Sequence, residues 1–249
     1  MIVFVTGASA GFGAAIARRF AKEGHRVVVT GRRRERLDAL AAELGHDKIL
    51  PLVFDVRDRQ AVARAFEELP AAFAEIDVLV NNAGLALGLE PAQKASLDDW
   101  EAMVDTNVKG LMYVTRAALP GMVARDRGLI VNLGSTAARY PYPGGNVYGA
   151  TKAFVHQFSL NLRADLLGTR VRVTDIQPGL VGGTEFSAVR FHGDADRAAK
   201  LYEGADALTP GDIAEAIYWV ATLPPRVNIN AIEMMPVTQA FGPLAVHRF

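Results

Sequence analysis

The chain has 249 residues with 27 basic and 27 acidic side chains, so its formal net charge is zero and no nucleic-acid partner is expected. Half of the residues are hydrophobic, which is enough apolar material for a large packed core. The absence of cysteine excludes disulfides, thiolate catalysis and cysteine-ligated metals, and the five histidines lack the i, i+4 pairing that would favour a metal site.

The first residues show no sign of a targeting segment. Met1 leads directly into the apolar run IVFVTG without a basic region or a cleavage site. The apolar stretches are far shorter than the roughly 18 residues that a membrane helix needs. We therefore expect a cytoplasmic protein that does not cross a membrane.

Strand-like and helix-like patterns alternate along the chain. From the N-terminus we predict a strand at Ile2–Thr6, a helix at Gly11–Glu23, a strand at Arg26–Thr30, a helix at Arg34–Leu44, a strand at Ile49–Phe54, a helix at Asp58–Ala74 and a strand at Asp77–Asn81. There follow a long helix at Leu97–Leu119 ended by Pro120, a strand at Leu129–Leu133, a helix at Val147–Leu167, a strand at Arg170–Ile176 stopped by Pro178, a helix at Pro210–Leu223 and a strand at Ile229–Met234.

This alternation predicts successive βαβ units. Right-handed crossovers then produce a Rossmann-like, doubly wound α/β fold with a seven-stranded parallel sheet and helices on both faces. Since no linker interrupts the pattern, we predict a single domain over residues 1–249. The irregular, glycine-containing segment 179–204 is predicted to form a substrate lid. The tail Ala240–Phe249 has no clear period and suits either a subunit contact or a loose end.

A glycine-rich turn joins the first strand to the first helix. It reads Thr6-Gly7-Ala8-Ser9-Ala10-Gly11-Phe12-Gly13. Glycines at such a junction let the backbone approach a pyrophosphate, which the helix N-terminus then faces. A tight connection without a ligand is the alternative, but the position after the first strand favours a dinucleotide site.

The end of the second strand bears on the choice between NAD and NADP. An NAD site usually places a carboxylate there, whereas this chain has Thr30-Gly31-Arg32-Arg33-Arg34. Arg32 and Arg33 match the geometry of a 2′-phosphate. A solvated basic helix start is the alternative, yet cations are unfavourable at a helix N-terminus. We therefore predict NADP as the cofactor.

Two further loops follow strands at the same edge. Asp55 is expected to accept a hydrogen bond from the adenine amino group, and Val56 to contact the adenine through its backbone. Asn81-Asn82-Ala83-Gly84 follows the fourth strand, at the edge where open α/β sheets bind ligands. Taken alone, this last segment also suits an ordinary turn.

Tyr148 and Lys152 are four residues apart in a predicted helix, so their side chains share a face. A nearby ammonium is expected to lower the phenol pKa and thereby make Tyr148 an efficient acid and base. Ser135, just after a strand, could hydrogen-bond the reacting oxygen. Asn107 lies inside a predicted helix that it suits poorly, and could hold a water that relays protons to Lys152.

These motifs resemble the short-chain dehydrogenase/reductase family over essentially the whole chain. The resemblance rests on TGASAGFG, NNAG, Asn107, Ser135, YGATK and Pro178-Gly179. It implies Asn107, Ser135, Tyr148 and Lys152 as catalytic residues. It also implies NADP binding by Gly7, Ser9, Gly11, Phe12, Gly13, Arg32, Arg33, Asp55, Val56, Asn82, Gly84, Tyr148, Lys152, Pro178, Gly179, Val181 and Thr184.

Longer segments resemble the NADP-dependent 3-hydroxy acid dehydrogenases of that family, among them GGNVYGATKAF and VRVTDIQPGLVGGTEFS. This implies a homotetramer acting on a small hydroxy acid such as serine or 3-hydroxypropionate, or on the semialdehyde. Ser135 and Tyr148 would hold the reacting oxygen. Arg190 is the first candidate for the anion anchor and Arg139 the second, although either could simply be solvated.

Three other functions remain open. Sulfoacetaldehyde reductases share much of this pattern, and a neutral-carbonyl reductase would need no cationic anchor. A non-catalytic NADP-binding protein could also use this fold. The intact set Asn107, Ser135, Tyr148 and Lys152 argues against the last of these.

Overall fold

The computed structural model describes residues 1–241, and most of the tail Ala240–Phe249 lies outside this range. Seven strands form one parallel sheet in the order β3-β2-β1-β4-β5-β6-β7, which confirms the predicted fold class. The strands are β1 (Ile2–Val5), β2 (Arg26–Gly31), β3 (Ile49–Val53), β4 (Val78–Asn81), β5 (Gly128–Leu133), β6 (Val171–Pro178) and β7 (Ala231–Met234).

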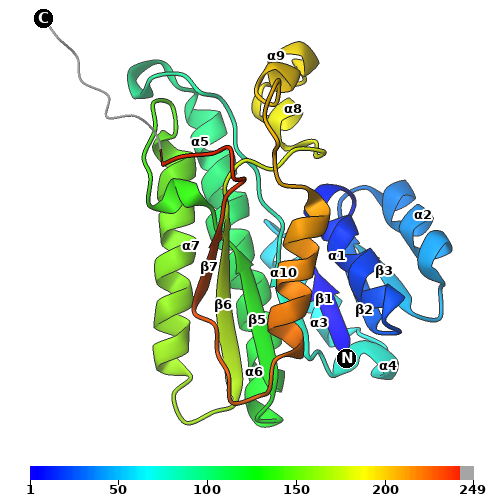
Figure 1. Ribbon diagram of the computed structural model, residues 1–249. Helices are drawn as coiled ribbons and strands as arrows, with labels where there is room; N and C mark the ends of the chain where they lie inside the picture. Colours follow the sequence, from blue (N-terminus) through cyan, green and yellow to red (C-terminus); the bar gives the residue numbers. More distant parts are fainter. Residues whose placement is uncertain (242–249) are drawn as a thin grey trace, which may run out of the picture.

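Helices cover both faces of the sheet (Figure 1). On one face, α1 (Gly11–Lys22), α2 (Arg34–Leu44) and α10 (Pro210–Thr222) bury residues such as Phe20, Leu37 and Ile217 against it. On the other face lie α3 (Arg59–Glu67), α4 (Ala71–Ala74), α6 (Leu111–Ala124) and α7 (Asn146–Asp165), whose buried residues include Met122 and Leu162. These two cores explain why the central strands are apolar on both sides.

Prolines behave differently from our predictions at three places. The helix predicted at Asp58–Ala74 is two helices, α3 and α4, because Pro70 interrupts it. The helix predicted to end before Pro120 continues to Ala124, since Ala118 and Met122 on either side pack into the core. The strand β6 includes Pro178 as its last residue instead of stopping before it.

The long helix predicted at Leu97–Leu119 is also not uniform. It consists of α5 (Leu97–Val104), a π-helical turn η2 (Asp105–Gly110), and α6. Such turns change the direction in which side chains point and are frequent at functional sites. Asn107 lies within this turn.

The segment 179–204 rises above the carboxyl ends of the strands (Figure 1). It is less irregular than predicted, because it contains the short helices α8 (Phe186–Arg190) and α9 (Ala195–Lys200). We call it the cap segment. The strand order reverses at β1 and β4, where ligands of doubly wound sheets bind. Among the described residues, no helix combines the length and the apolar character needed to cross a membrane.

Candidate active site

The turn after β1 can adopt its tight conformation only because of its glycines. Gly7 and Gly11 have φ values of +67° and +53°, in the left-handed region that favours glycine. A Cβ on Gly13 would lie 2.5 Å from the Gly7 carbonyl oxygen. The Asn82 amide donates to the carbonyls of Thr6 and Gly7 at 2.8 and 3.1 Å. The turn is thus fixed in place at the N-terminus of α1, the kind of position where proteins bind a pyrophosphate.

A group of cations lies beside this turn. Arg33 donates to the Ser9 hydroxyl from Nε at 3.2 Å and from Nη2 at 3.0 Å. Arg33 and Arg36 also contact the two carboxylate oxygens of Glu185 at 2.8 and 2.7 Å. This place therefore already holds an anionic group, and its donors suit the 2′-phosphate of NADP. Arg32 is exposed nearby.

Glu185 and Arg36 were missing from the predicted site. Arg36 continues the run of arginines that marked the end of β2, so the sequence held a signal for it. Glu185 had none, because it is 149 residues from Arg36 and belongs to the cap segment. Beside Glu185, Thr184 lies over the glycine turn, with its Cβ 3.5 Å from where a Cβ on Gly11 would be.

The two residues predicted to contact adenine after β3 both make contacts within the protein. The Asp55 carboxylate binds the Arg57 guanidinium at 2.7 Å and also accepts the Arg57 backbone N–H at 2.9 Å. Val56 is buried and packs against Gly110, since a Cβ on Gly110 would lie 2.8 Å from Cγ2 of Val56. Asp55 is thus already paired, and its contact with adenine stays a prediction.

Tyr148 and Lys152 lie next to each other on the inward face of α7, both more than nine-tenths buried. Lys152 Nζ donates to the Leu133 carbonyl at 2.7 Å and lies 5.8 Å from the centroid of the Tyr148 ring. Ser135 follows β5, and its Oγ accepts the Ala137 N–H at 3.1 Å. The structure therefore brings Ser135, Tyr148 and Lys152 together.

The pKa values of this pair are set mainly by burial. Burial raises the pKa of Tyr148 to about 12, while the Ser135 hydroxyl and the Arg190 guanidinium act against this rise. Burial also lowers the pKa of Lys152 to about 8, which the negative charge of Asp175 opposes. Our prediction of a lowered Tyr148 pKa is wrong for this structure, because desolvation of the phenolate outweighs the Ser135 hydrogen bond and the charge of Arg190.

Asn107 has a structural role that we did not predict. Its amide nitrogen donates to the Leu85 carbonyl at 2.8 Å and to Thr151 Oγ1 at 3.0 Å. Its amide oxygen accepts the Leu85 N–H at 2.9 Å. Both amide hydrogens are therefore used within the protein, and the predicted water relay to Lys152 stays a prediction. It fixes the loop after β4 against the helix that carries Lys152.

The two candidate anion anchors lie in different places. Arg190, on α8, has its Cζ 5.1 Å from the centroid of the Tyr148 ring and donates to the Tyr142 hydroxyl. Its Nε is buried without a hydrogen-bond partner among the described residues. Arg139 instead contacts His156 Nε2 at 3.5 Å. Only Arg190 is thus placed beside the phenol.

Aromatic residues complete this side of the site. Phe186 packs edge-on against Tyr148, with ring centroids 5.8 Å apart. Tyr142 was missing from our prediction, and no motif pointed to it. At the end of β6, the Gly179 N–H bonds to the Met234 carbonyl, and Val181 is buried in a bridge with Leu208. These residues connect the sheet to the cap segment.

Residues 1–194 match the family described as short chain dehydrogenase. The chain is 68% identical over 248 residues to the NADP-dependent 3-hydroxy acid dehydrogenase YdfG of Salmonella typhi, with both chains covered to 100%. It is 53% identical over 246 residues to the serine 3-dehydrogenase of Agrobacterium fabrum, covering 99% of this chain and 98% of the other.

Solved structures agree with this similarity. The closed form of a serine dehydrogenase complexed with NADP+ superposes with a TM-score of 0.99 at 64% identity, and both chains are covered to 100%. A serine dehydrogenase from Escherichia coli superposes with a TM-score of 0.85 at 59% identity, covering 96% of this chain and 100% of the other.

Proposed function

Because the chain belongs to the short-chain dehydrogenase family, we propose that it transfers a hydride between NADP(H) and a small 3-hydroxy acid or its semialdehyde. The observation that carries the substrate class is Arg190. A guanidinium beside the phenol, with a buried Nε that has no partner among the described residues, suits the carboxylate of such a substrate.

The residues around the glycine turn fit NADP. The backbone of the turn Thr6–Gly13 would hold the pyrophosphate, and Ser9 with Arg33 would hold the 2′-phosphate. Lys152 would hold the nicotinamide ribose hydroxyls. When bound, this cofactor supplies or accepts the hydride.

The chain's own residues handle the proton. In the reductive direction the Tyr148 hydroxyl donates its proton to the carbonyl oxygen, which the Ser135 hydroxyl also hydrogen-bonds. A pKa of about 12 keeps Tyr148 protonated near neutral pH, which suits proton donation. The charge on Lys152 stabilises the phenolate that remains. In the oxidative direction the phenolate removes the proton from the hydroxyl group of the substrate.

Arg190 also separates this proposal from its nearest alternative. A neutral aldehyde or ketone would leave the buried Nε without an acceptor, which is costly in a desolvated site. The oxygens of a sulfonate could also accept hydrogen bonds from the planar Arg190 guanidinium. A sulfoacetaldehyde reductase is therefore the second candidate. The two acids differ in shape, and kinetics can therefore distinguish them.

A panel of substrates tests the function. NADP-linked absorbance is followed during oxidation of serine, 3-hydroxypropionate, 3-hydroxyisobutyrate, isethionate and an uncharged alcohol of matching size. We expect the highest kcat/KM among the carboxylates. A preference for isethionate would favour the sulfonate, a preference for the uncharged alcohol would contradict the acid class, and no turnover with any of them would contradict the proposed reaction.

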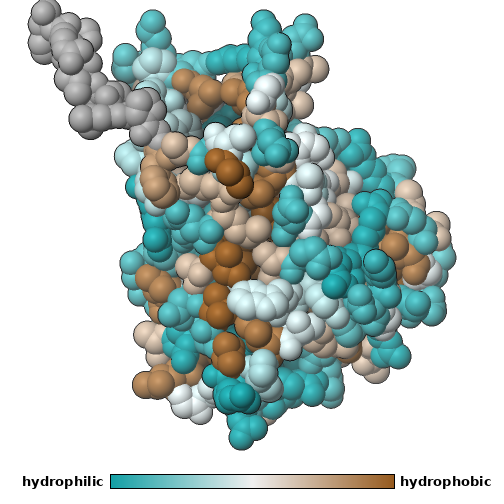
Figure 2. All heavy atoms as spheres, in the orientation of Figure 1, coloured by the Kyte–Doolittle hydropathy of each residue, from teal (hydrophilic) through white to brown (hydrophobic). Residues whose placement is uncertain are grey.

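We also propose that four copies assemble. The edge strand β7 leaves one side of its backbone unpaired within the sheet. Figure 2 shows hydrophobic residues gathered over β7 and between α7 and α10 on the same face. Light scattering should give four times the chain mass of 26.8 kDa, and a mass equal to that of one chain would contradict the assembly.

A further inference from the structure

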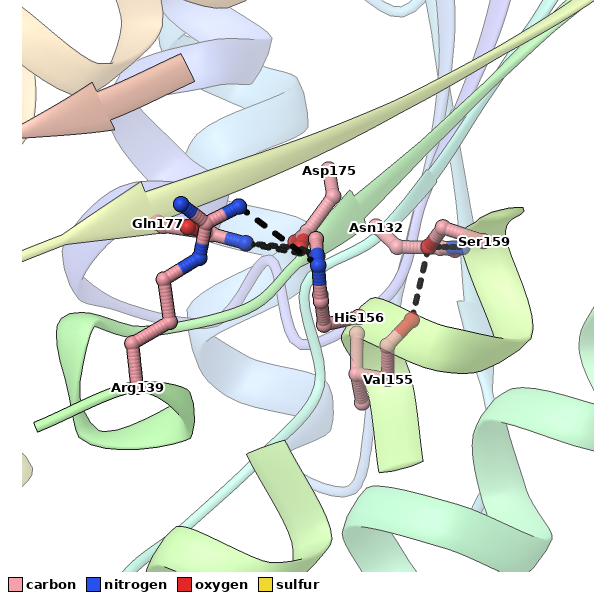
Figure 3. Close-up of polar contacts among 7 residues, drawn as sticks. All are labelled: Asn132, Arg139, Val155, His156, Ser159, Asp175 and Gln177. Atoms are coloured by element: carbon pink, nitrogen blue, oxygen red, sulfur yellow. Dashed lines mark hydrogen bonds and ion pairs between the residues drawn. The ribbon is translucent and has the colours of Figure 1, made fainter. Parts of the chain in front are cut away.

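A carboxylate that has no part in the proposed reaction is buried beneath α7. Asp175 on β6 has no exposed surface. Its Oδ2 accepts from Gln177 Nε2 at 2.6 Å and lies 2.9 Å from His156 Nδ1, as Figure 3 shows. Its Oδ1 is buried and has no hydrogen-bond partner among the described residues. Burying a carboxylate is costly, so a half-satisfied one calls for an explanation.

The position of Asp175 relative to α7 offers one. Asp175 pairs with Asn132 in the register of β5 and β6, and Asn132 donates to Ser159 on α7 at 2.9 Å. Lys152, His156 and Ser159 follow at intervals of four and three residues along that helix, so they share its inward face. Asp175 therefore lies under the same helix face as Lys152.

Gly134 connects the carboxylate more closely to the ammonium. A Cβ on Gly134 would lie only 2.2 Å from Asp175 Oδ1, so the unpaired oxygen reaches this part of the backbone. The preceding residue is Leu133, whose carbonyl accepts the hydrogen bond from Lys152 Nζ at 2.7 Å. The two buried charges thus approach consecutive residues, Lys152 at Leu133 and Asp175 at Gly134.

We propose that Asp175 is the counter-charge of Lys152 and keeps its ammonium protonated at the pH where the enzyme works. Asp175 is then a positioning residue, since it acts on the reaction through Lys152. The inference rests on the proposed roles of Tyr148 and Lys152. It explains both the buried carboxylate and the lack of a side chain at Gly134.

Burial lowers the pKa of Lys152, and the charge of Asp175 is the influence that opposes it. The other groups facing the pair are Tyr148 and His156 on α7 and Arg139 after β5, which contacts His156. On β7, Glu233 is bonded to the Tyr140 hydroxyl. A positive charge at position 156 would offset the negative charge of Asp175, because Nδ1 of the histidine contacts the Asp175 carboxylate directly.

The test follows the titration of Lys152 directly. Lys152 is one of only six lysines and the one that is buried, so its side-chain signal in lysine-labelled NMR can be assigned with Lys152→Arg. The spectra need neither cofactor nor substrate. In Asp175→Asn we expect the titration midpoint of Lys152, the pH at which its side chain is half protonated, to fall by about one pH unit or more. The reason is that the ammonium loses a nearby opposite charge. The pH above which reductase activity declines should also fall.

Two matched variants complete the experiment. Gln177→Met disturbs the same buried network but keeps the carboxylate, so the Lys152 midpoint should stay in place. His156→Lys sets a permanent cation against Asp175 and should lower the midpoint, whereas His156→Gln should not. His156 is partly exposed, so these variants decide the question if Asp175→Asn fails to fold.

An unchanged Lys152 midpoint in folded Asp175→Asn, or in His156→Lys, overturns the proposal. A shift of equal size in Gln177→Met also overturns it, since the carboxylate is intact there. A failure of the substrate panel, by contrast, would leave these midpoints as expected, so the two proposals fail separately.

Discussion

The guanidinium of Arg190 lies over the ring of Tyr148, with Cζ 5.1 Å from the ring centroid. The two residues come from different parts of the fold, since Arg190 ends helix α8 of the cap segment and Tyr148 lies in the first turn of α7. An anionic group held next to Tyr148 would therefore lie within reach of a cation.

Arg190→Gln should weaken the binding of acidic substrates. Loss of a charge-assisted hydrogen bond costs about 1.5–3 kcal/mol, which corresponds to a rise in KM of roughly 10- to 100-fold. Activity on an uncharged aldehyde should change little. Arg139→Gln is the matched control, because Arg139 contacts His156 instead. An unchanged KM for 3-hydroxy acids in Arg190→Gln would show that the anion is bound elsewhere.

Tyr148→Phe should reduce turnover by about two to four orders of magnitude, because general acid catalysis contributes roughly this much. The dissociation constant of NADPH, measured by fluorescence, should remain close to that of the unchanged protein. The phenyl ring keeps its packing against Phe186. Near-normal turnover in this variant would remove Tyr148 from the proposed mechanism.

Arg33→Gln should reduce the preference for NADPH over NADH. Arg33 is the guanidinium that meets Ser9, so its loss should raise the NADPH dissociation constant by roughly 10- to 100-fold and change that of NADH little. Arg34→Gln, one residue along, serves as the control. Equal losses for both cofactors would mean that Arg33 supports the fold of the turn instead of the 2′-phosphate.

Reductase activity should fall as the pH rises through about 8. The pKa of Lys152 is lowered to about 8, so its ammonium is present below this pH and lost above it. The pKa of Tyr148 is raised to about 12, so the phenol is still protonated there and cannot cause the decline. The profile of kcat/KM against pH checks this. In Lys152→Arg, whatever activity remains should no longer decline above pH 8. A flat profile to pH 10 in the unchanged protein would contradict the assignment of the decline to Lys152.

Asn107→Leu should destabilise the fold around the π-helical turn. It leaves the N–H and the carbonyl of Leu85 without partners, which costs about 2–4 kcal/mol and lowers Tm by roughly 5–15 °C. Asp105→Ala, in the same turn but on the surface, should lower Tm far less. Calorimetry distinguishes the two, and equal Tm values would show that the Asn107 bonds contribute little.

The patterns local to the sequence were sufficient for the fold and for much of the site. Short apolar runs predicted all seven strands, because the hydrophobic pattern of a strand is set by residues that are close together in the sequence. The glycine turn, the arginines after β2, and the pair Tyr148 and Lys152 were recognisable for the same reason. Helix ends near Pro70 and Pro120 were not, since one proline interrupts its helix and the other does not, and packing of Ala118 and Met122 around Pro120 makes the difference there.

The sequence by itself thus determined the order of the elements and the chemistry carried at each strand end. Only the tertiary structure decided which distant groups meet, such as Glu185 with Arg36 and Asp175 with His156. It also decided that the pKa of Tyr148 is raised, because the burial of this side chain depends on how the cap segment and α7 pack around it. Spacing along a helix specifies which side chains are neighbours, whereas desolvation and long-range pairing arise only once the chain has packed.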